Sequence, residues 1–107
     1  MNENNAILFS WTIFEISSQS DSLTGVMLRG RIRKFAISHN INVLVENASD
    51  KQNVVRFAIL EETELKSISQ FIKTICPDAI ISKRLANVQN PVLSKIKVND
   101  ASRYSVS

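Results

Sequence analysis

The sequence is poor in the residues that mark several classes of protein. It has two glycines, two prolines and one cysteine among 107 residues. So few glycines and prolines exclude a collagen-like or low-complexity chain, and a hydrophobic content of 44% excludes disorder over most of the length. The length suits one compact domain and no more. We therefore expect a single domain over residues 1–107, with a core at about residues 6–98 and a flexible tail at residues 99–107.

The lack of a second cysteine and of long apolar runs bears on the compartment. Cys76 has no internal partner for a disulfide, which favours a reducing environment. No run of 18 apolar residues is present, so we expect no membrane-spanning segment. The first five residues lack the positive charge of a signal peptide. These features predict a cytoplasmic protein without a membrane partner.

Charge and the standard motifs exclude further classes. A net charge of +3 suits an anionic ligand but is too weak to indicate a nucleic-acid partner. One histidine and one cysteine, His39 and Cys76, are too few for a Cys/His metal site, and neither a phosphate-binding P-loop nor a dinucleotide fingerprint is present. We expect no bound metal, no cofactor and no nucleic acid.

Four stretches have the pattern of strands. Residues 6–17 are apolar on both faces, which is typical of a strand inside a sheet, and the change of side between Ile13 and Phe14 suggests a bulge. Residues 41–46 and 54–60 predict a β-hairpin around a turn of good turn-formers. Residues 79–83 predict a fourth strand.

Two stretches have the helical period. Apolar residues recur at helical spacing from Val26 to His39, where Asn40 favours a left-handed end. A second amphipathic helix follows Thr63, its predicted N-cap, and ends before Pro77. Alternating residues 92–98 predict a fifth strand.

The order of these elements is β-α-β-β-α-β. It predicts an α+β, ferredoxin-like sandwich with two helices on one face of a four- or five-stranded antiparallel sheet. This architecture hosts many unrelated activities, so the function must come from a site.

The junction between the polar loop and the first helix is the strongest candidate site. A loop of serine, threonine and glycine that leads into a helix offers backbone N–H groups and the positive end of the helix dipole to an anion. Gly25 allows the backbone to turn closely around a ligand, and Arg29 adds a two-pronged donor for phosphate oxygens.

At this point the chain resembles the acylphosphatases. The run Gly25-Val26-Met27-Leu28-Arg29 is similar to their Gly-Val-x-Phe-Arg. In that family a catalytic asparagine follows the arginine by eighteen residues in a Val-x-Asn sequence, and this chain has Val45-Glu46-Asn47 at the same spacing. Asp50 in the hairpin turn, Pro77 and Ala79-Ile80-Ile81 also match, so the resemblance covers residues 11–98. The family's Gly-x-Val-Gln-Gly-Val differs: residues 21–26 keep only the last Gly-Val, in a longer loop.

The resemblance implies an enzyme that hydrolyses the carboxyl-phosphate bond of acyl phosphates. It implies that Arg29 and Asn47 are catalytic: Arg29 would bind the phosphoryl group, and Asn47 would position the attacking water. It also implies a phosphate-binding loop made by Thr24, Gly25, Val26, Met27 and Leu28, with no metal, no cofactor and no covalent intermediate. The ligand would be a small acyl phosphate or inorganic phosphate, and we expect a monomer.

Two alternatives remain open at this stage. One is a weakly active or inactive acylphosphatase-like domain that binds an anion or a protein, which the altered loop favours. The other is a ferredoxin-like regulatory or nucleic-acid module. The low net charge and the single aromatic residue of the strand at 54–60, Phe57, argue against that second alternative.

Overall fold

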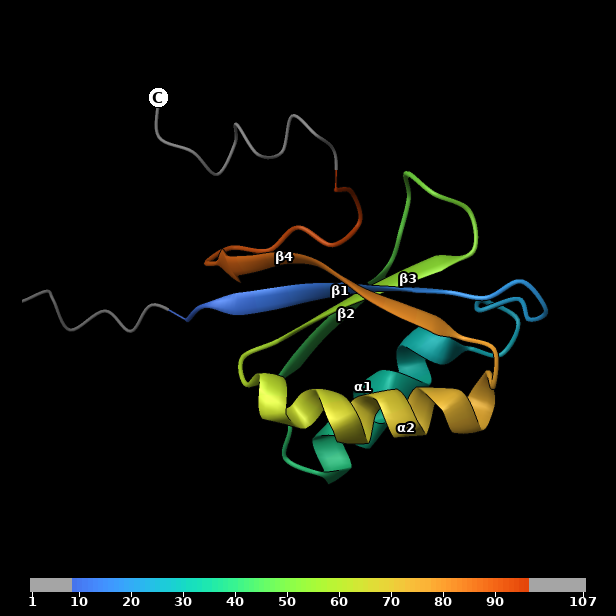
Figure 1. Cartoon of the computed structure of the whole chain (residues 1–107), viewed down its shortest axis with the longest axis horizontal. Helices are drawn as coiled ribbons and strands as arrows, with labels where there is room; N and C mark the ends of the chain where they lie inside the picture. Colours follow the sequence, from blue (N-terminus) through green and yellow to red (C-terminus); the bar gives the residue numbers. More distant parts are fainter. Residues whose placement is uncertain (1–8, 97–107) are drawn as a thin grey trace, which may run out of the picture.

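Four strands and two helices form in the computed structural model of the chain, which describes residues 9–96 (Figure 1). The elements are β1 (Trp11–Ser17), α1 (Leu28–Ser38), β2 (Val43–Asn47), β3 (Val54–Ile59), the short 3₁₀ turn η2 (Glu62–Glu64), α2 (Leu65–Ile75) and β4 (Ile80–Val88). The strands make one antiparallel sheet in the order β2-β3-β1-β4. The chain is therefore an α+β protein, compatible with the predicted ferredoxin-like arrangement.

Strand β1 lies in the middle of the sheet, between β3 and β4. The five inner residues of β1 are all buried, which confirms that both of its faces are covered. The predicted irregularity is present, but its extra residues belong to the partner strand. Ile13 lies opposite Leu85 whereas its neighbour Phe14 lies opposite Lys83, so β4 carries one residue more than β1 at this step.

The main core lies between the sheet and the two helices, which cover the same face (Figure 1). Strands β1 and β3 alternate, so that every second side chain points toward the helices. Phe14 and Phe57 stack there at 5.2 Å between ring centroids. The buried residues of this core are Phe14, Ile16, Leu23, Leu28, Ile32, Val45, Val55, Phe57, Ile59, Ile68, Ile72, Cys76 and Ala79.

The other face of the sheet is covered by the segment of residues 89–96, which follows β4. Leu93 packs there against Ile13 and Ala58. The predicted fifth strand is wrong for residues 92–96, because this segment lies over the sheet and does not pair with an edge. The Ser94 carbonyl accepts hydrogen bonds from the backbone and the hydroxyl of Ser49, in the turn between β2 and β3. Residues 97–98, where this strand was predicted to end, lie outside the described residues.

Single residues decide where the helices begin and end. Helix α1 begins at Leu28 and not at Val26, because Met27 has a left-handed backbone (φ 55°) that a helix cannot contain. His39 is its C-cap and Asn40 is left-handed (φ 55°), both as predicted. The prediction of Thr63 as N-cap is wrong: Thr63 lies inside η2, and Glu64 precedes α2.

Some predicted boundaries differ or cannot be compared. Strand β4 is longer than the predicted 79–83, and the first strand begins at Trp11. The start of the predicted strand at residues 6–8, the end of the predicted core and the predicted tail at 99–107 lie outside the described residues. Within residues 9–96, no helix is both long and apolar enough to cross a membrane.

Candidate functional site

The loop between β1 and α1 is fixed by two side chains from other parts of the chain. Asn53, in the hairpin turn, donates from Nδ2 to the carbonyls of Ser18 (2.9 Å) and Asp21 (2.8 Å) and accepts from the Leu23 N–H at 2.8 Å. Asp78, after α2, accepts hydrogen bonds from the Ser18 hydroxyl and from the N–H groups of residues 19 and 20. The Ser18 hydroxyl at 2.7 Å is the main cause that lowers the pKa of Asp78. The loop is therefore anchored at both ends of the polar segment.

The loop uses most of the amides that the sequence assigned to phosphate. The N–H of Gly25 donates to the Ser22 hydroxyl (3.1 Å), and that of Val26 donates to the Ser22 carbonyl (3.0 Å). The amides of Met27 and Leu28 donate to the carbonyls of residues 24 and 23, each at 3.0 Å. Within residues 9–96, the amides of Arg29 and Gly30 in the first turn of α1 have no such acceptor. Together with the amide of Thr24, which also has no acceptor among these residues, they are the N–H groups left for an anion.

The predicted catalytic pair lines one hollow. Arg29, in the first turn of α1, and Asn47, the last residue of β2, line a cavity of about 280 Å³. Thr24, Met27 and Leu28 from the predicted loop also line it, together with Leu23 and Gly30. Gly25 and Val26 do not line this cavity. The fold thus brings together five of the seven predicted site residues, although β2 and the loop are far apart in sequence.

The Arg29 and Asn47 side chains of this hollow are unengaged within the described residues. Among residues 9–96, no hydrogen bond or ion pair holds the Arg29 guanidinium or the Asn47 amide. Arg29 is half-buried and Asn47 is exposed. The first turn of α1 contains no acidic residue, so the dipole of the helix and Arg29 act with the same sign. An anion in the hollow would meet a positive field and an unpaired guanidinium.

Sequence reasoning missed two lining residues and the strained position of the loop. Leu23 forms part of the buried floor of the hollow. It was not singled out in the sequence because the residues around it in the loop are polar. Gly30 was not considered, although it stands in the first turn beside Arg29. The left-handed residue of the loop is Met27 and not Gly25. Gly25 has a close approach instead, since a Cβ there would lie 3.2 Å from the Ser22 side chain.

A buried charge cluster on the other face of the sheet was also missed. Arg56 in β3 is fully buried and donates from Nε to Glu15 in β1 at 2.8 Å. Its two terminal nitrogens donate to Asp50 at 2.8 and 3.2 Å, and one of them also reaches the Leu93 carbonyl at 3.1 Å. The signal was present in the sequence, because Glu15 and Arg56 are the lone charges in strands made mostly of apolar residues.

The cluster shifts the pKa of each carboxylate. Hydrogen bonds from Arg56 are the main cause that lowers the pKa of Asp50 to about 2. Burial alone would raise the pKa of Glu15, but hydrogen bonds from Arg56 and Lys51 outweigh it and hold this pKa below its usual value. Burial would lower the pKa of Arg56, and its two carboxylate partners instead raise it. Both acids are therefore ionised and fully engaged at neutral pH, which suits a structural cluster.

Comparisons with known proteins give no match. No family model, no curated protein and no solved structure matches this chain. Within the described residues, no group of three or more His, Cys, Asp or Glu side chains is arranged to hold a metal ion. The proposed enzymatic function rests on the hollow between β2 and α1.

Proposed function

We propose that the protein is an acylphosphatase-like hydrolase with a ferredoxin-like βαββαβ fold. The observation that supports the proposal is that Arg29 and Asn47, eighteen residues apart, line one hollow at a helix N-terminus with no other partner among residues 9–96. A cation and an amide beside two open backbone N–H groups suit a phosphoryl group and a water.

In this proposal each residue has one task. The Arg29 guanidinium binds two oxygens of the phosphoryl group and stabilises the charge that builds on them in the transition state. The amides of Arg29 and Gly30 add to this clamp. The Asn47 side chain accepts a hydrogen bond from the attacking water and holds it in line with the bond to the carboxylate. The carboxylate is a good leaving group, so positioning and electrostatics carry the reaction.

The first test is hydrolysis of acetyl phosphate by purified protein, followed as release of phosphate. Arg29→Ala removes the charged clamp, so we expect turnover to fall by about 10²–10³, as for the loss of one transition-state donor. Arg33→Ala is the matched control, because Arg33 lies one turn further along α1 and does not line the hollow. We expect its turnover to be unchanged.

The second test separates chemistry from binding. Asn47→Ala removes the water-positioning amide but leaves the anion site, so kcat should fall by about tenfold or more while phosphate still binds. Binding is read as thermal stabilisation by phosphate, about 1–3 kcal/mol at tens of Kd, against chloride of equal ionic strength. Asn42→Ala, just before β2, is the control. An Asn47→Ala protein with full activity would show that the wrong residue was assigned.

The alternative is an inactive domain that binds an anion at the same hollow. The use of four loop amides inside the loop favours it, since fewer donors remain for a transition state. Stabilisation by phosphate that depends on Arg29, without any phosphate release from a folded wild-type protein, would establish this alternative. We also propose a cytoplasmic location, which the single, buried cysteine supports, and a monomeric state.

A further inference from the structure

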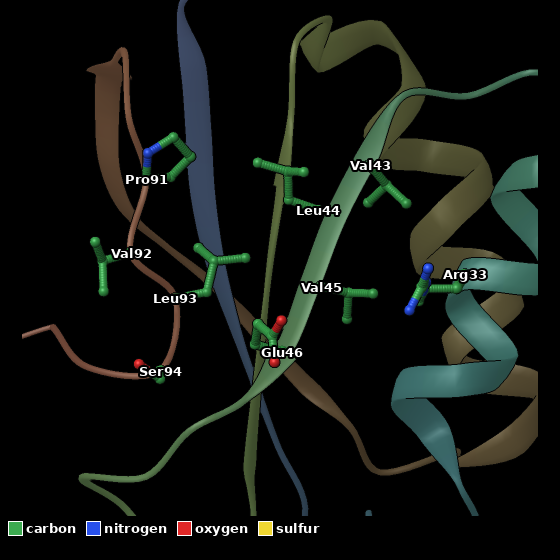
Figure 2. A pocket seen from close by; sticks show the side chains of 9 residues that line it. All are labelled: Arg33, Val43, Leu44, Val45, Glu46, Pro91, Val92, Leu93 and Ser94. Atoms are coloured by element: carbon green, nitrogen blue, oxygen red, sulfur yellow. The ribbon is translucent and has the colours of Figure 1, made fainter.

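A groove of about 650 Å³ runs along β2, on the far side of this strand from β3. It is lined by residues 43–46 of β2, by residues 91–94 and by Arg33 of α1. Figure 2 shows residues 91–94 running alongside β2 on one side, with Arg33 on the other side of the strand. Since β2 ends the sheet, the floor of this groove is the free edge of a strand.

The free edge of β2 presents unpaired backbone groups. The N–H of Ala48 donates to the carbonyl of Val54, the residue opposite to it in the hairpin. Hydrogen-bonded and non-hydrogen-bonded pairs alternate in an antiparallel ladder, so the residues that point their backbone away from β3 are 43, 45 and 47. Among residues 9–96, β2 pairs with β3 alone.

The two edge strands of the sheet, β2 and β4, differ in how far they are protected against pairing with another strand. Proteins block an edge strand against pairing with lysine, proline or bulges. Strand β4 has Lys83, Arg84 and two register shifts in its pairing with β1. Strand β2 reads Val-Leu-Val-Glu-Asn, regular and without any lysine or proline, and its Leu44 is 39% exposed. An unpaired edge strand that carries Val43, Leu44 and Val45, on a protein that protects its other edge, indicates a site for a partner.

The walls of the groove favour a single strand over a second copy of the chain. Helix α1 rises on one side of β2 and residues 91–94 rise on the other, so the edge is recessed (Figure 2). For two β2 edges to pair, each molecule would have to fit its own α1 and residues 91–94 past the walls of the other. A slim extended peptide meets no such obstacle.

The charged residues of the groove indicate which side chains the bound peptide carries. Arg33 lies on the wall of α1, with Val43 and Val45, whereas Glu46 shares the other wall with Leu44. Side chains alternate along an added strand, so those on the α1 side meet Arg33 and those on the other side meet Leu44 and Glu46. We propose that the groove binds an extended segment of another protein as an added antiparallel strand, with acidic side chains toward α1 and basic and apolar ones toward residues 91–94.

The probe is the peptide TKEVEVT, whose lysine meets Glu46, whose glutamates meet Arg33 and whose first valine meets Leu44. Titration into the full-length protein should shift the backbone amide resonances of residues 43–47 and 91–94 and leave those of α2 unchanged. The same peptide with N-methyl groups on the bonding residues cannot donate to β2 and should not bind.

Charge variants test the register. Arg33→Glu should weaken binding of TKEVEVT by about tenfold, and the swapped peptide TEKVKVT should recover it on the double variant R33E/E46K. Both residues are exposed, so the variants keep the fold. No shift with TKEVEVT at millimolar concentration would overturn the proposal. So would concentration-dependent dimers with shifts at residues 43–47 without peptide, or peptide binding that requires deletion of residues 97–107.

Discussion

Arg56 shows at the scale of one residue how this small protein buries a charge. Its side chain is fully buried, and each of its three side-chain nitrogens donates a hydrogen bond to Glu15 or Asp50. The carbonyl of Leu93 accepts one more. A buried guanidinium is tolerated only when its hydrogen-bonding groups are matched in this way, because an unmatched charge in the interior is very costly.

Removal of this guanidinium should destabilise the protein strongly. Arg56→Met fills similar space but leaves Glu15 and Asp50 without their shared partner, and we expect a loss of about 3–5 kcal/mol in the free energy of unfolding. Urea titration followed by circular dichroism measures it. Lys83→Met is the control: Lys83 pairs with Glu62 at 3.1 Å, both side chains are about half exposed, and the expected change is within about 1 kcal/mol. Equal effects of the two substitutions would contradict this account.

At the scale of the elements, periodicity predicted the type of each helix and strand, and single residues set the ends. Alternation and helical spacing identified β1, α1, β2, β3, α2 and β4 because they record which side chains face the core. The start of α1 depended on the left-handed backbone of Met27. Methionine rarely adopts this conformation, so it could not be predicted from the sequence. Asn40 was predictable, since asparagine favours that conformation.

The same comparison explains what could be predicted of the candidate site. Spacing and resemblance selected Arg29 and Asn47, and the pairing of β2 with β3 brings them to one hollow. The amides of residues 25–28 could not be assigned from the sequence, because their acceptors are set by the path of the loop. That path depends on Asn53, thirty residues away from Leu23.

The two glycines should respond oppositely to alanine. A Cβ at Gly30, inside α1, would meet no atom within 4 Å, so Gly30→Ala should raise the stability by about 0.5–1 kcal/mol through helix propensity alone. A Cβ at Gly25 would lie 3.2 Å from the Ser22 side chain, which holds the loop, so Gly25→Ala should lower the stability. Thermal melts of both variants decide this. A gain in stability from Gly25→Ala would mean that the loop shifts at little cost to make room for the added Cβ.

At the scale of the whole molecule, the two faces of the sheet are covered differently. The helices bury one face with a large apolar core, whereas residues 89–96 bury the other with a small one around Ile13, Ala58 and Leu93. The sequence could not reveal this, because alternation in residues 92–98 indicates only that every second side chain is buried. It does not distinguish a strand at an edge from a segment laid across a face.

The sheet face that residues 89–96 cover should be the first part of the protein to open in acid. The pKa of Asp50 is about 2 in the folded protein, below its ordinary value of 3.8, and that of Glu15 is also lowered. Because the folded pKa values are depressed, the stability that these ionised groups contribute is complete above about pH 5 and is lost as the pH falls toward 2. The loss from Asp50 is about 2 kcal/mol, from the size of its shift.

The loss of stability in acid should begin in the segment of residues 89–96, because Asp50 also accepts a hydrogen bond from the Ile96 N–H at 3.0 Å. Protonation of Asp50 weakens this bond and the bond to Arg56, which itself holds the Leu93 carbonyl. Hydrogen exchange between pH 6 and pH 3, corrected for intrinsic rates, should therefore show Ile96 losing protection before the amides of α2. Asp50→Asn should weaken protection of Ile96 already at pH 6 and flatten the dependence of stability on pH. Loss of protection at the same pH in α2 and at Ile96 would instead mean that the two faces unfold as one unit.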